Sequence, residues 1–300
     1  MGKPLMMDGR KPDESITIQV DGHKVVAYSY GVGDEVLFCI NGGPGLPCDY
    51  VRDSHSWLAD KGYRVVAYDQ LGTGNSDKPK DDSLWTVERY TEEAETVRAA
   101  LNLGNVHLYG QSWGTWIGIE YALTYQENFK TLTLSNGAAN IPHLANELKR
   151  LRLSLGPETE AMMQRHEAEG SEDHAEYQAA VTVLNYRHVC RLDVWPDAVN
   201  RSFEGMNLDP YKTIWGPNEF TVTGNLKDWN RIPDLARISQ PALVLCGQHD
   251  HLSPECSYKM HDALPNSRIK VIENSSHLSM WEQPDVYFTA LLDFLGAHHG

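Results

Sequence analysis

Residues 105–124 read NVHLYGQSWGTWIGIEYALT, and this stretch decides the fold that we expect. Its first five residues form a short apolar run typical of a buried strand, and residues 113–124 are typical of the helix that follows such a strand. Between them lies GQSWG at 110–114, which fits the pattern G-x-S-x-G. Glycines two before and two after the serine permit a turn too sharp for larger side chains. The stretch therefore predicts a strand, a strained turn that exposes Ser112, and a helix.

Short runs rich in apolar residues recur on both sides of this turn. We expect strands at 16–20, 24–30, 35–40, 63–68, 105–109, 130–134, 242–246 and 268–272. Helical spacing of apolar residues separates most of them, at 50–61, 91–103, 113–124, 257–264 and 286–295. Strands and helices that alternate in this way form a mostly parallel sheet flanked by helices. The chain is therefore predicted to have an α/β fold.

The alternation is interrupted between residues 139 and 231. This region has little strand signal and much charge, and helical spacing falls at 144–155, 158–169 and 174–188. We expect one α/β core, formed by residues 1–138 and 232–300, and an inserted helical cap formed by residues 139–231. An insertion of this kind usually serves as a lid over an active site.

A serine at such a turn becomes a nucleophile only with a base and a group that orients the base. In proteins with this turn the chain order is serine, acid, histidine, with the last two after late strands. Asp250 follows the strand at 242–246, and His277 follows the strand at 268–272. Both therefore lie at the same edge of the sheet as Ser112. We predict that His277 takes and returns the Ser112 proton and that Asp250 fixes the His277 tautomer.

Acyl transfer also needs hydrogen-bond donors for the oxyanion that forms in the reaction. One candidate is the backbone N–H of Trp113, next to the nucleophile. The second is expected in the stretch NGGPG at 41–45, which directly follows a predicted strand. Successive glycines let the backbone approach a substrate closely. We favour the N–H of Gly43 as the second donor.

The chain has 13 histidines, so His277 has rivals as the base. His249 and His251 flank Asp250, but neighbours in sequence rarely face each other across an active site, and neither follows a strand of its own. The remaining histidines fall in predicted helices, strands or the cap, or at the end of the chain. A metal at Asp250 and His251 would need further ligands, and no second cluster stands out in the sequence. We therefore expect neither a metal nor another cofactor.

Composition limits the partners of the protein. The formal net charge of −15 repels phosphate backbones and anionic membranes, so we expect neither as a partner. No apolar run approaches the roughly 18–20 residues that cross a bilayer, and residues 1–12 lack the apolar segment of a secretory signal. The five cysteines are scattered and form no C-x-x-C pair. Together these observations predict a cytoplasmic protein.

Five stretches carry a family resemblance: GGPG at 42–45, YDQLGTGNS at 68–76, GQSWG at 110–114, NEF at 218–220 and SHLSMWE at 276–282. With them the chain resembles the proline iminopeptidase family of α/β-hydrolases, in particular the branch of the tricorn-interacting aminopeptidase and the L-amino-acid amidases. The resemblance covers nearly the whole chain. It implies an α/β-hydrolase fold with a helical cap. It also implies a serine peptidase or amidase that releases an N-terminal amino acid from short peptides, or ammonia from amino-acid amides.

The resemblance also implies a short-peptide or small-molecule substrate with a free amine. In the family, carboxylates of the cap and of a loop hold the α-ammonium group, and Glu219 matches the cap position. A second carboxylate is expected directly after the catalytic aspartate, where this chain has His251. The chain also departs from the family at Asn41, where a histidine is usual, and at Leu71, where an arginine is common.

Two other functions remain open from the sequence. A carboxylesterase or lactonase would use the same three catalytic residues and would need no carboxylate for an amine. A non-enzymatic hydrolase-fold receptor would keep the fold, although the intact Ser112, Asp250 and His277 argue against it. Oligomeric state is not predicted by any of these features. Four aromatic residues of the cap either line an apolar substrate pocket or anchor the cap: Trp195, Tyr211, Trp215 and Phe220.

Overall fold

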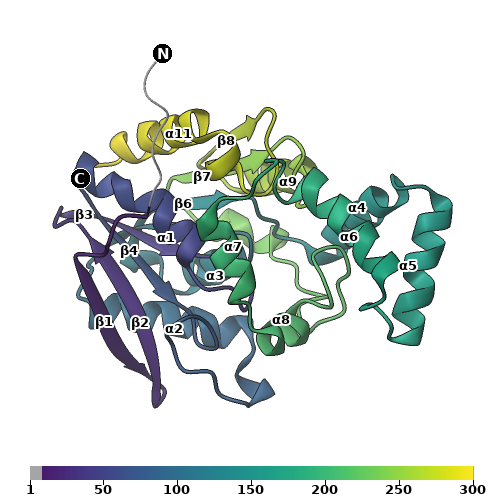
Figure 1. Ribbon diagram of the computed structural model, residues 1–300. Helices are drawn as coiled ribbons and strands as arrows, with labels where there is room; N and C mark the ends of the chain where they lie inside the picture. The colour runs from purple at the N-terminus through teal and green to yellow at the C-terminus, as the bar shows by residue number, and fades with distance from the viewer. Residues whose placement is uncertain (1–8, 300) are drawn as a thin grey trace.

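Eight strands within the described residues form one sheet, in the order β1-β2-β4-β3-β5-β6-β7-β8 (Figure 1). The structure is a computed structural model and describes residues 9–299. The β1–β2 and β2–β4 pairs are antiparallel, and the other neighbouring pairs are parallel. The predicted α/β fold with a mostly parallel sheet is confirmed. The strands are β1 (Glu14–Val20), β2 (His23–Tyr30), β3 (Glu35–Ile40), β4 (Tyr63–Asp69), β5 (Val106–Gln111), β6 (Phe129–Ser135), β7 (Ala242–Gly247) and β8 (Ser267–Ile272).

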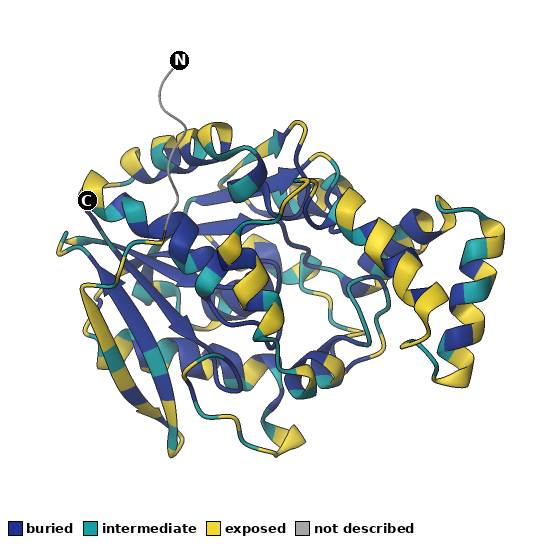
Figure 2. Cartoon of the chain, in the orientation of Figure 1, coloured by how far each residue is buried: buried dark blue, intermediate teal, exposed yellow. Residues whose placement is uncertain are grey.

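Alternation of side chains along the strands creates two apolar faces. In β3, Val36, Phe38 and Ile40 belong to one apolar layer, and Leu37 and Cys39 belong to the other. Helices α2 (Val87–Ala100), α3 (Trp113–Thr124) and α9 (Pro254–Ala263) cover the first face, and α1 (Asp49–His55) and α11 (Pro284–Gly296) cover the second. Figure 2 shows central strands in dark blue beneath helices with exposed outer faces. Burial on both faces explains why these strands are nearly continuous apolar runs.

The core helices lie close to their predicted positions, with two differences at their ends. They are α1 (Asp49–His55), α2 (Val87–Ala100), α3 (Trp113–Thr124), α9 (Pro254–Ala263) and α11 (Pro284–Gly296). A short helix that the sequence did not predict, α10 (Ser279–Glu282), precedes α11. α2 begins before residue 91 because the Thr86 side chain caps it, accepting the Arg89 N–H at 3.3 Å. The helix expected at 50–61 is α1 followed by a 3-10 turn, which Gly62 ends in a left-handed conformation with φ 91°.

Five helices lie between β6 and β7 in the chain, in residues 139–231, which we call the cap segment. They are α4 (Ile141–Leu153), α5 (Pro157–Glu169), α6 (Ala175–His188), α7 (Asp197–Glu204) and α8 (Leu208–Ile214). In Figure 1, α5 extends farthest from the sheet, whereas α7 lies beside α1. The sequence predicted α4, α5 and α6 but not the two short helices. α7 depends on packing that no local pattern reveals: its Arg201 donates to Asp53 of α1 at 2.6 Å.

No helix within residues 9–299 is long and apolar enough to cross a bilayer. The stretch considered for a secretory signal lies mostly outside the described residues. All five cysteines are buried as free thiols. Cys39 and Cys246, on the central strands, pack as small core residues.

Candidate active site

The turn between β5 and α3 holds Ser112 in a backbone conformation that few side chains adopt, with φ 56° and ψ −122°. Two glycines make the turn possible. A Cβ atom on Gly110 would lie 2.1 Å from the Gly114 carbonyl oxygen, and one on Gly114 would lie 2.2 Å from the Ile40 carbonyl oxygen. The Ser112 N–H donates to the Ser135 carbonyl at 3.0 Å, which ties the turn to β6. The sharp turn predicted from the sequence is present, with Ser112 at the start of α3.

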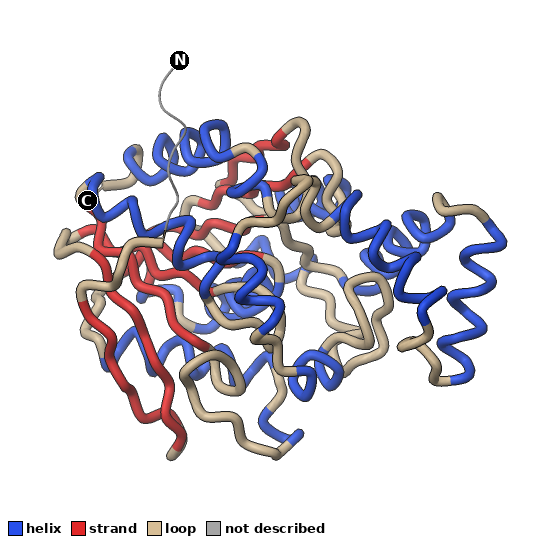
Figure 3. The backbone as a smooth tube through the Cα atoms, viewed as in Figure 1, coloured by secondary structure: helices blue, strands red, loops and turns tan. Residues whose placement is uncertain are grey.

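The loops after β7 and β8 leave the sheet at the same edge as this turn, because all three strands are parallel (Figure 3). They bring Asp250 and His277 together, with His277 Nδ1 2.9 Å from Asp250 Oδ1. Burial alone would raise the pKa of Asp250, but the charge and hydrogen bond of His277 outweigh burial and place that pKa below its usual value. Asp250 is therefore an anion that fixes the Nδ1 proton of His277 and leaves Nε2 free to react.

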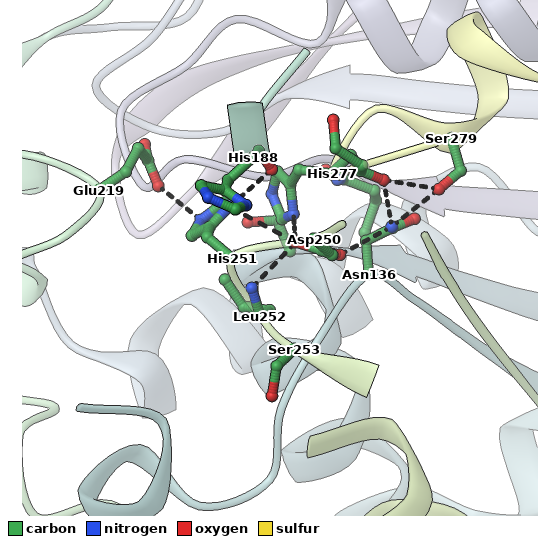
Figure 4. A network of polar contacts seen from close by, with 12 residues as sticks. Asn136, His188, Glu219, Asp250, His251, Leu252, Ser253, His277 and Ser279 are labelled. Carbon is green, nitrogen blue, oxygen red and sulfur yellow. Dashed lines mark hydrogen bonds and ion pairs between the residues drawn. The ribbon is translucent and has the colours of Figure 1, made fainter. Parts of the chain in front are cut away.

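Asp250 is itself held by Asn136, a residue that sequence reasoning missed (Figure 4). The Asn136 amide nitrogen donates to Asp250 Oδ2 at 2.8 Å, to the Ser276 carbonyl at 3.1 Å and to Ser279 Oγ at 3.0 Å. Asn136 is fully buried and has φ 53°, a conformation that asparagine tolerates better than most residues. Its sequence signal is an Asn-Gly pair directly after a strand, which predicts only a turn.

Ser112 and His277 line the same pocket, which has a volume of about 20 Å³. A single water molecule needs about 10–15 Å³, so a substrate must widen this pocket. The Ser112 hydroxyl makes no hydrogen bond to His277 within residues 9–299, and in enzymes this contact often tightens only in the complex with substrate. The other lining residues are Gly43, Leu46, Tyr50, Val189, Phe203, Glu219 and Leu278.

The two backbone groups expected to bind the oxyanion lie beside Ser112. Gly42 is in direct contact with it, since a Cβ atom on Gly42 would lie 2.8 Å from the Ser112 Cβ. The Gly42 N–H donates to the Tyr50 hydroxyl at 2.7 Å and is thus occupied. The next N–H, of Gly43, makes no hydrogen bond within the described residues, and Gly43 lines the pocket. Trp113 is the first residue of α3, where the N–H has no partner within the helix.

A buried chain of hydrogen bonds connects two loops of the site. One is the glycine loop, residues 41–45, and the other is the loop after β8 that carries His277, which we call the histidine loop. The Tyr50 hydroxyl, which accepts from Gly42, donates to Gln111 Oε1. The Gln111 amide then donates to the His277 carbonyl at 3.2 Å. Gln111 directly precedes Ser112, so a single chain of hydrogen bonds joins all three loops of the site. No sequence pattern marks Tyr50, because its side chain meets its partners only in the folded protein.

A second chain of hydrogen bonds passes through Asn41, where the family resemblance led us to expect a histidine. The Trp113 indole N–H donates to Gln70 Oε1 at 2.8 Å, and the Gln70 amide donates to the Asn41 carbonyl at 3.1 Å. The Asn41 amide donates to the Gly42 and Leu46 carbonyls, each at 2.9 Å. Asn41 therefore fixes the glycine loop from within, which explains how asparagine can stand at this position.

Glu219 reaches the pocket from the loop after α8. Its Oε1 accepts the Tyr211 hydroxyl at 2.8 Å, and its Oε2 faces His251. The side chain is 16% exposed. Burial alone would raise the pKa of Glu219, but the contact with His251 and the charges of His251 and His277 lower that pKa below its usual value. The pocket of Ser112 thus contains an ionised carboxylate, as the resemblance implied.

His251 lies between the two carboxylates of the site (Figure 4). Its Nε2 is 3.3 Å from Glu219 Oε2, and its Nδ1 is 3.4 Å from Asp250 Oδ1. Its ring centre is 4.3 Å from that of His277. The expectation that neighbours in sequence do not face each other is wrong here, because a tight turn after β7, with Asp250 N–H donating to the Gly247 carbonyl, folds His251 back towards Asp250. His277 is nonetheless the closer of the two imidazoles to Asp250.

The four cap aromatics do not line the pocket. Trp215 stacks on Trp116 of α3 with ring centres 5.2 Å apart, which anchors the cap segment to the core. Tyr211 binds Glu219, and Phe220 packs against His251 with ring centres 5.5 Å apart. The apolar lining comes instead from Leu46, Val189, Phe203 and Leu278.

Two clusters of histidine and carboxylate groups within residues 9–299 have the spacing for a metal ion. One is Asp250, His251 and His277, whose polar atoms are already engaged with one another. The other combines the buried His166 with the exposed His174 and Glu176, and His174 Nδ1 accepts the Glu176 N–H and caps α6. We assign a metal to neither cluster, because groups of each cluster already bind other groups of the protein.

Comparison with known proteins places this site in a family. The model of the alpha/beta hydrolase fold family matches residues 35–284. A proline iminopeptidase of Heyndrickxia coagulans is 35% identical over 266 residues, which are 88% of this chain and 92% of the relative. The crystal structure of VinJ is similar with a TM-score of 0.91 at 32% identity, covering 96% of this chain and 100% of that one. A proline iminopeptidase structure from Mycobacterium smegmatis has a TM-score of 0.87 at 31% identity, with 95% and 98% covered.

The resemblance carried by the five sequence stretches is thereby confirmed. The chain belongs to the proline iminopeptidase family of the alpha/beta hydrolase fold.

Proposed function

We propose that the protein is a serine hydrolase that removes an N-terminal amino acid from short peptides, or ammonia from amino-acid amides, through an acyl-enzyme on Ser112. The observation that carries the proposal is the pocket that Ser112, His277 and Glu219 share. It combines a nucleophile, a base and a carboxylate suited to a free amine. The relatives named proline iminopeptidase support the same class of reaction.

The first half of the reaction forms the acyl-enzyme. The Ser112 hydroxyl attacks the carbonyl carbon of the amide while His277 Nε2 takes its proton. The carbonyl oxygen becomes an oxyanion, to which the N–H groups of Gly43 and Trp113 donate. Asp250 stabilises the imidazolium at His277. The imidazolium then protonates the leaving nitrogen, the C–N bond breaks, and the amine or ammonia departs.

Water completes the cycle through the same groups. His277 takes a proton from a water molecule, whose oxygen attacks the acyl carbon and forms a second oxyanion. When this oxyanion collapses, the bond to Ser112 breaks and His277 returns the proton to the serine oxygen. The product is a free amino acid.

Glu219 gives the enzyme its preference for a free amine. A carboxylate that is largely shielded from water attracts an ammonium group more strongly than an exposed one. An ammonium held there fixes the distance between the end of the substrate and Ser112, so that only the first amide bond reaches the nucleophile. A substrate with a blocked amine has no cation to offer Glu219.

We extend the proposal to the division of the chain into a core (residues 1–138 and 232–300) and a cap (residues 139–231). The cap contributes Glu219, Val189 and Phe203 to the pocket, and the core contributes Ser112 and His277. A volume of about 20 Å³ is too small for an aminoacyl group. We therefore propose that the cap shifts to admit substrate and closes over it during the reaction.

The test compares an aminoacyl-arylamide with its N-acetylated analogue. Wild type should hydrolyse the free-amine substrate with much the higher kcat/KM. Glu219→Gln should lower that kcat/KM by about 10- to 100-fold, because a hydrogen bond to a charged group contributes about 1.5–3 kcal/mol. Hydrolysis of the acetylated substrate should stay the same. Glu204→Gln, at an exposed glutamate of α7, is the matched control and should resemble wild type on both substrates.

Equal hydrolysis of the two substrates by wild type would contradict the proposal and favour a carboxylesterase or lactonase, which has no use for an ammonium site. Loss of both activities in Glu219→Gln would show that the carboxylate supports the fold of the pocket rather than the amine.

A further inference from the structure

One imidazole of the site has no part in the reaction described above. His251 is fully buried in the loop after β7. Each element packed around it presents a charged or titratable group. Within the described residues these groups are Glu219 after α8, His188 at the end of α6, His277 after β8, and Asp250 and His249 of its own loop.

The two ring nitrogens of His251 have different surroundings. Nδ1 lies 3.4 Å from Asp250 Oδ1 and 3.4 Å from the carbonyl oxygen of His188. Both neighbours accept hydrogen bonds, so Nδ1 carries a hydrogen whether the ring is neutral or charged. Nε2 is therefore the nitrogen that gains or loses a proton.

Nε2 faces the carboxylate that we assign to the substrate amine. It lies 3.3 Å from Glu219 Oε2 and is buried, yet it makes no well-aligned hydrogen bond within the described residues. When protonated, Nε2 pairs with Glu219 by charge. When deprotonated, its lone pair is a second acceptor beside the same carboxylate.

An arriving ammonium group meets these two states differently. Glu219 Oε1 already accepts the Tyr211 hydroxyl, so Oε2 is the oxygen left for a cation. A protonated His251 competes for that oxygen and places a like charge beside the ammonium. A neutral His251 removes the competing charge and offers Nε2 to one of the ammonium hydrogens.

We propose that His251 determines how strongly the site selects a free amine: its neutral form completes the ammonium site with Glu219, and its protonated form blocks it. The inference rests on the proposed function, since it requires an ammonium group at Glu219. Binding of the cation to the protonated state releases the Nε2 proton to solvent, so one positive charge replaces another. A substrate without an amine leaves His251 protonated.

The electrostatics of the pocket make both states accessible. Burial alone would lower the pKa of His251, but its contact with Glu219 and the charges of Asp250 and Glu219 raise that pKa above its usual value. An ordinary histidine has a pKa of about 6.5. His251 is therefore protonated in mildly acidic solution and becomes neutral as the pH rises through its pKa.

The kinetic test is the ratio of KM for a free-amine arylamide to KM for its N-acetylated analogue, measured across pH. Effects of His277 act on both substrates and cancel in the ratio. In wild type the ratio should rise by up to about tenfold per pH unit as the pH falls below the pKa of His251. His251→Gln, which cannot titrate, should lose this rise. His249→Gln, at the neighbouring half-exposed histidine, is the matched control and should keep it.

A binding measurement keeps the test independent of turnover and of any effect on folding. Calorimetry of an amino-acid amide with Ser112→Ala, in buffers of different ionisation enthalpy, counts protons released on binding. Below the pKa of His251 we expect the release of nearly one proton per bound amine. The double variant Ser112→Ala/His251→Gln should release none. If the amide binds without proton release, or if His251→Gln keeps the wild-type pH dependence, the role of His251 is overturned while the amine preference stands. If free-amine and acetylated compounds bind equally well, the proposed function itself fails.

Discussion

Tyr50 is a side chain that helps to hold the glycine loop, residues 41–45, in place. Its hydroxyl accepts the Gly42 N–H at 2.7 Å and donates to Gln111, the residue before Ser112. Tyr50 is buried, and its ring lines the pocket of Ser112. The Tyr50 hydroxyl therefore holds the glycine loop from outside, together with the Asn41 amide within it.

Tyr50→Phe tests this dependence. An unsatisfied buried donor costs about 1–3 kcal/mol, and part of this loss should appear as displacement of Gly43, lowering kcat by about tenfold. Tyr30→Phe is the control, because the buried Tyr30 hydroxyl makes no hydrogen bond within the described residues. It should keep wild-type kcat and an equal or higher melting temperature. Wild-type kcat in Tyr50→Phe would show that the loop does not need this hydroxyl.

The sequence predicted the residues of the site that belong to local patterns, and it missed those that meet only by folding. Ser112 lies in a pentapeptide, and Asp250 and His277 each follow a strand, so a short window contains their signal. Tyr50 and Gln111 are 61 residues apart, and Asn136 and Asp250 are 114 residues apart. Hydrogen bonds between such partners leave no periodicity in the chain.

At the scale of elements, the end of β6 holds together the loops that follow β7 and β8. Asn136, directly after β6, donates to Asp250 in one loop and to the Ser276 carbonyl in the other. The carboxyl ends of the three parallel strands lie at one edge of the sheet. The Asn136 amide connects the two loops that follow β7 and β8 at this edge. Alignment of Asp250 with His277 therefore depends on a third element.

Asn136→Gly removes the amide and keeps a residue that tolerates φ 53°. Leaving Asp250 Oδ2 without its donor should lower the free energy of unfolding by about 1–3 kcal/mol and lower kcat for every substrate alike. Asn102→Gly is the matched control, since Asn102 is exposed and has φ 50°. It should change neither quantity appreciably. Denaturant unfolding and kcat measured on both variants decide the matter, and equal results for the two would contradict the role of Asn136.

The histidine loop is also held by the end of α6, which belongs to the cap segment. The N–H groups of His277 and Leu278 donate to the carbonyls of His188 and Val189 at 3.2 Å and 3.1 Å. The cap segment is therefore attached directly to the loop that carries His277. If the cap shifts to admit substrate, these two hydrogen bonds should stay in place while other parts of the cap segment move.

Long helices were predicted more accurately than short ones. The three-turn helices α4, α5 and α6 show apolar spacing over 13 or 14 residues and were found within a few residues of their bounds. The helices α7, α8 and α10, of 8, 7 and 4 residues, were missed. Such short segments repeat the helical period only once or twice, and their conformation depends on packing against the core.

At the scale of the whole molecule, the active site is made by two parts of the chain that meet at a small pocket. One side carries Ser112 and His277, and the other carries Glu219. Core residues are predictable because buried parallel strands are continuous apolar runs. The approach of the cap segment to Ser112 is not, because it depends on contacts such as the stacking of Trp215 on Trp116. The candidate catalytic residues can thus be predicted from local patterns, whereas the approach of Glu219 to Ser112 depends on the assembled molecule.

The central claim is that Ser112 is the nucleophile of a pocket that accepts a free amine. Labelling with a fluorophosphonate, with the modified residue located by mass spectrometry, tests both parts in one measurement. We predict a single adduct on Ser112, absent in Ser112→Ala. An amino-acid amide should slow the labelling, and its N-acetylated form should not. No adduct, an adduct elsewhere, or equal protection by the two amides would contradict the account.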